Sequence, residues 1–211
     1  MENISKNLEI DYSKNQLNEQ EANANPFFQF KKWFDEACLI ETAPTAFTLA
    51  TATATAFPSA RILYLKEFDE SGFVFYTNYK SRKGLEIVEN PNGAMLFFWA
   101  NSERQVRIEG RIEEIDNKQS DDYFAIRPRE SQLASYASEQ SAVIPNKQFL
   151  EERIEKLSIE MPDIIERPDW WGGYRLKPVR IEFWQGRPNR LNDRLLYTKS
   201  IEIWKINRLA P

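Results

Sequence analysis

The sequence contains no histidine and only one cysteine, Cys38, among its 211 residues. The missing histidine excludes a Ser-His-Asp triad and any histidine-ligated metal. A single cysteine excludes an internal disulfide and a cysteine-rich metal site. We therefore predict no metal centre, and any enzymatic chemistry must come from a bound cofactor or from other side chains.

Long apolar runs and a strong net charge are also missing. The longest purely apolar stretch, 94–100, is too short to cross a bilayer, so we expect no membrane insertion. No basic segment followed by an apolar run opens the chain, which predicts no signal peptide and a cytoplasmic location. With 28 basic and 32 acidic residues, the net charge of -4 argues against nucleic-acid binding. An anion site must then be a local group of cations.

The remaining sequence predicts one β-rich domain over 25–211, preceded by a flexible N-terminal segment, 1–24, with Tyr12 as its anchor. Asn25-Pro26 predicts a helix start, followed by an aromatic stripe at helical spacing. Further helices are expected at 81–90, 117–125 and 145–159, with a helix or ordered loop at 130–141. Strands are expected at 46–54, 61–66, 72–78, 94–99, 103–115, 174–176, 180–184 and 201–206. Together, these predicted strands and helices indicate a barrel or a strongly bent sheet with several helices.

The stretch 59–83 joins two of these strands to a helix start and has cations at its corners. Ile62, Leu63, Tyr64 and Leu65 are all bulky, which predicts a strand buried on both faces. Arg61 and Lys66 lie five residues apart, so on a regular strand their side chains face opposite sides. Either they bind two different anions, or they are ordinary charged residues at the strand ends.

Ser81 can cap the helix that follows, with Arg82 and Lys83 in its first turn. Cations at a helix N-terminus are unfavourable in isolation. They are explained either by a bound phosphate or by simple solvation.

Two later segments repeat this chemistry. Tyr123, Arg127, Arg129 and Ser131 provide a phenol, two guanidiniums and a hydroxyl around a helix end and the turn after it, a set suited to phosphate. The segment 184–194 is aromatic and basic, and includes Arg190 and Arg194. It is either a second ligand-binding segment or an exposed hairpin with salt bridges.

Taken together, these motifs resemble the pyridoxine (pyridoxamine) 5′-phosphate oxidase family. The matching stretches run in order from about residue 25 to 211 and are RILYLK, FVFYTNYKSRK, ERQVRIEG, YFAIRPRESQ, SEQS, WWGGYRL, IEFWQGRPNRLNDR and WKINRLAP. The resemblance implies a β-rich α+β fold, an FMN-binding split β-barrel with peripheral helices. It also implies a homodimer with FMN at the subunit interface. The implied reaction oxidises pyridoxine or pyridoxamine 5′-phosphate to pyridoxal 5′-phosphate, with O2 as acceptor and H2O2 as product, in vitamin B6 biosynthesis and salvage.

The resemblance also implies the site residues. The FMN contacts are Arg61, Ile62, Leu63, Tyr64, Leu65, Lys66, Tyr76, Thr77, Arg82, Lys83, Gln105, Gln140, Ser141, Trp184 and Arg194. The substrate contacts are Lys66, Tyr123, Arg127, Ser131, Arg190 and Asn192. Arg190 and Asn192 are the implied catalytic positions, and Arg190 would lie over the substrate ring near the reacting carbon.

The chain departs from the family pattern in three places: no arginine shortly precedes Tyr12, the residues Tyr64, Ala125-Ile126 and Leu133–Tyr136 differ from the commoner ones, and Asn192 replaces a histidine. The family usually reads Arg-Leu-His-Asp-Arg where this chain has Asn192 in place of the histidine. Asparagine donates and accepts hydrogen bonds, but it does not take up or release a proton at neutral pH. Two alternatives therefore stand beside the oxidase: a split-barrel flavoprotein with another substrate, and a non-catalytic protein that binds FMN or pyridoxal phosphate.

Overall fold

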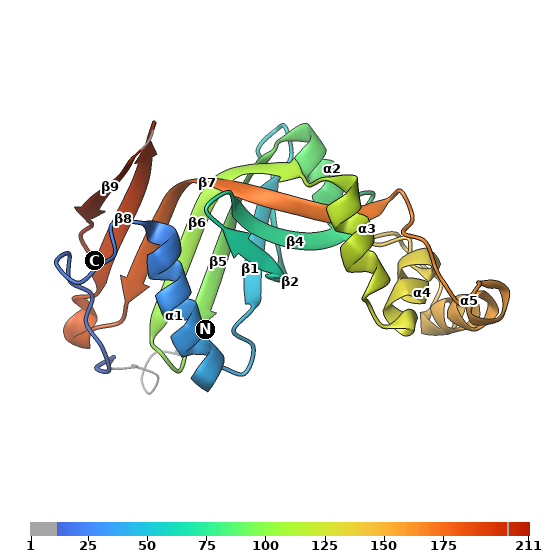
Figure 1. Ribbon diagram of the computed structural model, residues 1–211, viewed down its shortest axis with the longest axis horizontal. Coiled ribbons are helices and arrows are strands. Elements are labelled where there is room, and N and C mark those ends of the chain that lie inside the picture. Colours follow the sequence, from blue (N-terminus) through green and yellow to red (C-terminus); the bar gives the residue numbers. More distant parts are fainter. Residues whose placement is uncertain (1–11, 202) are drawn as a thin grey trace, which may run out of the picture. The chain divides into compact units, whose positions relative to one another are not determined.

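The computed structural model describes residues 12–201 and 203–211 (Figure 1). Its helices are α1 (Pro26–Ile40), α2 (Arg82–Glu89), α3 (Asn117–Ala125), α4 (Arg129–Ala137), α5 (Lys147–Glu160) and the short 3-10 helix η2 (Pro188–Arg190). Its strands are β1 (Ala46–Ala52), β2 (Pro58–Tyr64), β3 (Glu67–Asp69), β4 (Gly72–Asn78), β5 (Asn92–Trp99), β6 (Arg104–Glu114), β7 (Trp171–Gln185), β8 (Asp193–Ser200) and β9 (Ile203–Arg208). Among the described residues, no helix combines the length and the apolar character needed to cross a membrane.

The strands form a nine-stranded sheet in the order β2-β1-β5-β6-β7-β4-β3, with β8 paired to β7 and β9 paired to β8. The chain divides into two compact units, which we describe separately. The first unit comprises Met1–Leu49, Ala94–Gly110 and Pro178–Pro211, and the second comprises Ala50–Gly93 and Arg111–Lys177.

Aromatic side chains build the core of the first unit. The Asn25 side chain accepts a hydrogen bond from the Phe27 N–H, so α1 begins where the sequence predicts. Two rings of α1 contact strand residues. The ring centroids of Phe30 and Phe97 are 5.3 Å apart, and those of Trp33 and Phe183 are also 5.3 Å apart. These ring contacts fix α1 against strands of the same unit.

The second unit carries α2 and the three helices α3, α4 and α5 (Figure 1). Its strand β4 has the predicted bounds and pairs with β7 from Phe73 opposite Leu176 to Asn78 opposite Trp171. A small apolar cluster is formed by buried side chains of α3, α4, β7 and the segment before β7, namely Phe124, Leu133, Trp171 and Ile165. This cluster supports the helix end that carries Arg127.

The predicted burial of both faces of 61–66 is wrong in this chain. Strand β2 ends at Tyr64 and forms an edge of the sheet, with β1 as its neighbour. Ile62 is 67% exposed and Tyr64 is 54% exposed. An edge strand has a partner on one side only, so bulky residues alone do not predict burial.

The C-terminal strands also differ from the prediction. The two strands predicted at 174–176 and 180–184 are one strand, β7, which pairs with β4 before Pro178 and with β8 after it. Strand β8 begins at the end of the basic stretch 184–194, which we interpreted either as a ligand-binding segment or as an exposed hairpin, and continues to Ser200, where no strand was predicted. Arg194 is the one arginine of this strand, and pairing to both β7 and β9 decides its conformation.

Residues 12–24, part of the predicted flexible segment 1–24, pack against other residues of the first unit. The Tyr12 and Trp184 rings pack edge to face with their centroids 5.5 Å apart, and the Leu17 side chain is buried. Residues 1–11 lie outside the described residues. Tyr12 therefore contacts one of the predicted cofactor residues.

Candidate functional site

A buried lysine lies at the N-terminus of α2. Lys83 is 6% exposed, and its Nζ donates to Thr77 Oγ1 (3.1 Å), Ser81 Oγ (2.9 Å) and Gln140 Oε1 (2.8 Å). All three acceptors are neutral, and within the described residues no carboxylate pairs with Lys83. Burial, together with the nearby charge of Arg61, lowers the pKa of Lys83 to about 8. A buried cation with neutral partners at a helix N-terminus is well suited to a bound anion.

Two arginines and a buried glutamate adjoin this lysine. Arg82 Nε donates to Glu86 Oε1 at 2.8 Å, and Arg61 Nη2 lies 3.3 Å from Glu86 Oε2. The same Oε2 accepts the Thr51 and Ser59 hydroxyls, both at 2.5 Å. Burial by itself would raise the pKa of Glu86, but these hydrogen bonds and the Arg61 charge lower it to about 2. Glu86 is therefore an ionised carboxylate inside a group of cations.

We call Arg61, Arg82 and Lys83 the α2 cation cluster. The loop after α4 joins it, because Ser141 Oγ accepts the Arg82 backbone N–H at 3.2 Å and Gln140 accepts from Lys83. Three positive charges against the single charge of Glu86 leave an excess that suits a doubly charged phosphate. Residues from β2, α2 and the 138–142 loop are thus brought together in one place.

A second cation lies at the end of α3 without a carboxylate partner among the described residues. The Arg127 guanidinium lies over the Trp171 ring, 4.4 Å from its centroid, and 5.3 Å from that of Phe124. Its Nη1 donates to Ser135 Oγ at 2.8 Å, and this hydroxyl donates to the Ser131 carbonyl at 3.0 Å. Burial lowers the pKa of Arg127, whose guanidinium nevertheless stays protonated. These contacts hold the Arg127 guanidinium in place, and its planar set of N–H donors is suited to an anion.

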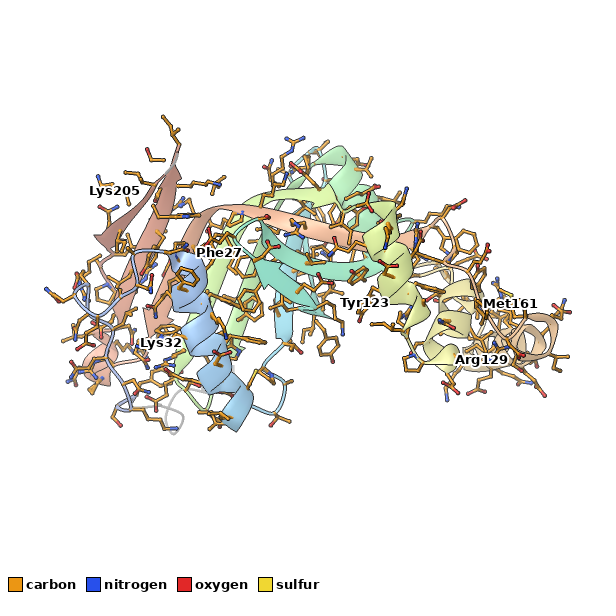
Figure 2. The ribbon with its side chains drawn as sticks, viewed as in Figure 1. Phe27, Lys32, Tyr123, Arg129, Met161 and Lys205 are labelled. Atoms are coloured by element: carbon orange, nitrogen blue, oxygen red, sulfur yellow. The ribbon has the colours of Figure 1, made fainter. Side chains whose placement is uncertain are left out.

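Tyr123 and Lys66 lie beside each other in the same unit. Tyr123, labelled in Figure 2, stacks on Tyr76 with ring centroids 4.0 Å apart. Lys66 Nζ lies 5.9 Å from the Tyr123 ring centroid. Burial, with the neighbouring Glu67 carboxylate, raises the pKa of Tyr76. We call Lys66, Tyr123, Arg127 and Ser131 the Arg127 cluster.

Three predicted cofactor residues, Gln105, Trp184 and Arg194, lie in the first unit. Arg194 faces Trp184 across the β7–β8 pair. Its Nε donates to Glu182 Oε1 at 2.8 Å, and its Nη1 donates to the Ala210 carbonyl at 2.7 Å. These two bonds hold the guanidinium in one orientation. Gln105 lies half-buried on β6.

The two predicted catalytic residues flank the end of η2. Asn189 and Arg190 have φ angles of 55° and 60°, in the left-handed region that non-glycine residues rarely adopt. The Asn192 Oδ1 accepts the Arg187 backbone N–H at 3.0 Å. With this oxygen engaged in the loop, the side-chain NH₂ of Asn192 is the group that remains to donate to a ligand.

Several residues that shape these clusters escaped sequence reasoning. Glu86 lies four residues after Arg82 on the same helix, a spacing that could have predicted the ion pair. Ser135 lies eight residues after Arg127, and Glu182 lies on another strand than its partner Arg194, so neither carries a local signal. The predicted contacts Ile62, Leu63 and Tyr64 lie on β2, and Leu65 and Lys66 follow it.

Comparisons with known proteins decide the family. A family model described as pyridoxamine 5′-phosphate oxidase matches residues 35–159. A second, described as the pyridoxine 5′-phosphate oxidase C-terminal dimerisation region, matches residues 171–211. A relative from Burkholderia thailandensis named pyridoxine/pyridoxamine 5′-phosphate oxidase is 52% identical over 208 residues, which are 97% of each chain. The chain belongs to the pyridoxamine 5′-phosphate oxidase family.

Solved structures similar to this oxidase-family chain confirm the predicted split-barrel fold. PhzG from Burkholderia lata, solved with tetrahydrophenazine-1-carboxylic acid, has a TM-score of 0.85 and 29% identity, covering 91% of this chain and 95% of its own. A pyridoxamine 5′-phosphate oxidase-related, FMN-binding protein from Nostoc punctiforme has a TM-score of 0.70 and 18% identity, covering 90% and 100%. At that identity the second comparison supports the fold alone.

Proposed function

We propose that this protein is an FMN-dependent oxidase that converts pyridoxine and pyridoxamine 5′-phosphates to pyridoxal 5′-phosphate. O2 is the electron acceptor and H2O2 a product, with ammonia released from the amine. The observation that carries the proposal is the presence, in one family member, of two separate cation clusters suited to phosphate. One contains buried Lys83 with only neutral partners, and the other contains Arg127 over Trp171.

In this proposal the α2 cation cluster binds the FMN phosphate. Arg61, Arg82 and Lys83 supply charge, and Thr77, Gln140 and Ser141 supply hydroxyl and amide groups at the same place. FMN supplies the two-electron redox chemistry, so the lack of histidine in the chain is no obstacle to the reaction. The backbone of β2 and the following residues, with Tyr76, would lie along the flavin.

The Arg127 cluster binds the substrate phosphate in the same proposal. Lys66, Tyr123, Arg127 and Ser131 fix that end of the substrate, and Arg190 and Asn192 approach its ring. We propose a homodimer with FMN at the subunit interface, a state supported by the match of residues 171–211 to a dimerisation region. Gln105, Trp184 and Arg194 would complete the flavin site there.

A direct experiment tests the oxidase proposal. Purified protein should be yellow, with a flavin absorbance spectrum and FMN released on denaturation. It should consume O2 and form H2O2 and pyridoxal 5′-phosphate when given either B6 phosphate. A colourless protein that takes up no FMN on titration would rule the proposal out.

A second candidate is a flavoprotein of the same fold with a different substrate. It is favoured by Asn192, which cannot transfer a proton at neutral pH as a histidine does. The similar PhzG structure contains a ligand that is not a B6 phosphate. Bound FMN without B6-phosphate turnover would support this candidate. Tight binding of FMN or pyridoxal phosphate without turnover of any substrate would instead indicate a binding protein.

Changing Asn192 to histidine should raise kcat with the B6 phosphates about tenfold. A positioned imidazole can exchange a proton with the substrate, an effect worth at least this much in many enzymes. Steady-state O2 uptake at equal FMN content measures the gain. The control is Asn189→His, which places the same side chain at a neighbouring left-handed position. No gain from Asn192→His would mean that this position does not limit turnover.

Affinity for FMN should fall as the pH rises above about 8. The pKa of Lys83 is about 8, so this lysine loses its charge in the flavin-free protein above that pH. A phosphate monoester is already doubly charged there, because its second pKa is near 6. Each further pH unit should weaken binding by up to about tenfold, by proton linkage. Fluorescence titration across pH 7–10 measures the slope, and a flat profile would show that Lys83 does not face the phosphate.

A further inference from the structure

The α2 cation cluster contains a negative charge of its own. Glu86 is 3% exposed, and both of its oxygens are hydrogen-bonded inside the cluster. An ionised carboxylate inside a proposed phosphate site is unexpected, because it repels the ligand that the cations attract. Its position therefore needs an explanation beyond the binding of phosphate.

The hydrogen bonds of the arginines show what this carboxylate does without a ligand. Arg61 directs Nη2 to Ser59 Oγ and toward Glu86, and Nη1 to Thr51 Oγ1 at 2.5 Å. Arg82 directs Nε to Glu86. Glu86 thus takes the charge-assisted bonds of both arginines, as a bound phosphate would.

Lys83 behaves differently from the two arginines. Its amino group is bound by hydroxyl and amide oxygens at the end of α2. Of the three cations, the two arginines are ion-paired to Glu86, and Lys83 is not. An incoming phosphate must therefore compete with Glu86 for the arginines but not for Lys83.

We infer that Glu86 is a built-in substitute for the phosphate, which stabilises the α2 cation cluster when no ligand is bound and weakens phosphate binding by competing for Arg61 and Arg82. The inference rests on the proposed function in taking the FMN phosphate as the ligand. Glu86 is a positioning residue here. The chemistry requires only a doubly charged phosphate, so inorganic phosphate is a second probe of the same site.

Glu86→Gln tests this inference, because glutamine keeps the size of the side chain and removes its charge. The flavin-free variant should unfold at a lower temperature, since the cations lose their partner. Its affinities for FMN and for inorganic phosphate should both rise about tenfold, because one repelling charge is gone. Its affinity for riboflavin, which has no phosphate, should stay the same.

Glu89→Gln is the matched control. Glu89 is exposed on the same helix, so this change removes the same charge where solvent screens it. It should alter the affinity for FMN less than twofold. Isothermal titration of flavin-free protein with FMN, riboflavin and inorganic phosphate, together with thermal unfolding, gives all the required values.

The titrations distinguish competition by Glu86 from a role in which Glu86 only orients the arginines. Weaker or unchanged binding of FMN and phosphate by Glu86→Gln would overturn the inference, and would mean that Glu86 only orients the arginines. An equal gain for riboflavin, or for Glu89→Gln, would also overturn it, because the effect would then not arise at the phosphate. If the protein binds no flavin, the proposed function fails, and the phosphate titration still tests the role of Glu86.

Discussion

Replacing Lys83 by methionine should weaken FMN binding roughly 100-fold, because each charge-assisted bond to a phosphate contributes about 1.5–3 kcal/mol. The lysine is buried and its partners in the described chain are neutral, so its charge has no structural role in pairing a carboxylate. Methionine has a similar length and no desolvation cost. The flavin-free variant should therefore be at least as stable as the parent protein.

In Lys83→Met, FMN affinity should therefore fall while the thermal stability of the flavin-free protein does not. Thermal unfolding of the flavin-free proteins measures the stability, and FMN titration measures the affinity. Lys80→Met is the control, because Lys80 is an exposed lysine whose Nζ lies 5.3 Å from the Trp170 ring centroid. It should change FMN affinity only a few-fold. Retained FMN affinity in Lys83→Met would remove the α2 cation cluster from the flavin site.

Replacing Arg127 by methionine should raise the KM for both B6 phosphates about 100-fold and leave FMN bound. The guanidinium is held over Trp171 and by Ser135, and methionine removes a charged fork of donors at that place. Each lost charge-assisted bond contributes about 1.5–3 kcal/mol, and more than one is available to a phosphate. The α2 cation cluster contains none of these residues, so flavin content should not change.

Steady-state kinetics at measured FMN occupancy checks this separation of the two anion sites. Arg129→Met is the matched control, since Arg129, labelled in Figure 2, donates to the Met161 and Pro162 carbonyls. It should lower stability with little effect on KM. Arg127→Lys should recover part of the lost affinity, because it restores charge without the fork. Loss of FMN in Arg127→Met would contradict the assignment of two separate sites.

Several elements followed from local sequence alone because their signals are local. Asn25-Pro26 and Ser81 cap their helices as predicted, and β4 has the predicted bounds. The absence of histidine excluded a Ser-His-Asp triad and histidine-ligated metals, and the order of the motifs indicated the family. These features depend on single residues or on neighbours along the chain, which the sequence displays directly.

The charge environment of the site came only from the tertiary structure. Lys83 and Gln140 are 57 residues apart, and Arg61 and Glu86 are 25 apart, yet each pair is in contact. Burial of Lys83 and the competition by Glu86 follow from such contacts, which no local pattern encodes. For the same reason bulky residues on β2 were predicted to be buried but lie on an edge strand. The sequence by itself determined which residue types were available and which short elements form. Long-range packing decided which cations have a carboxylate partner and which are held by neutral groups, because desolvation and pairing depend on neighbours in space.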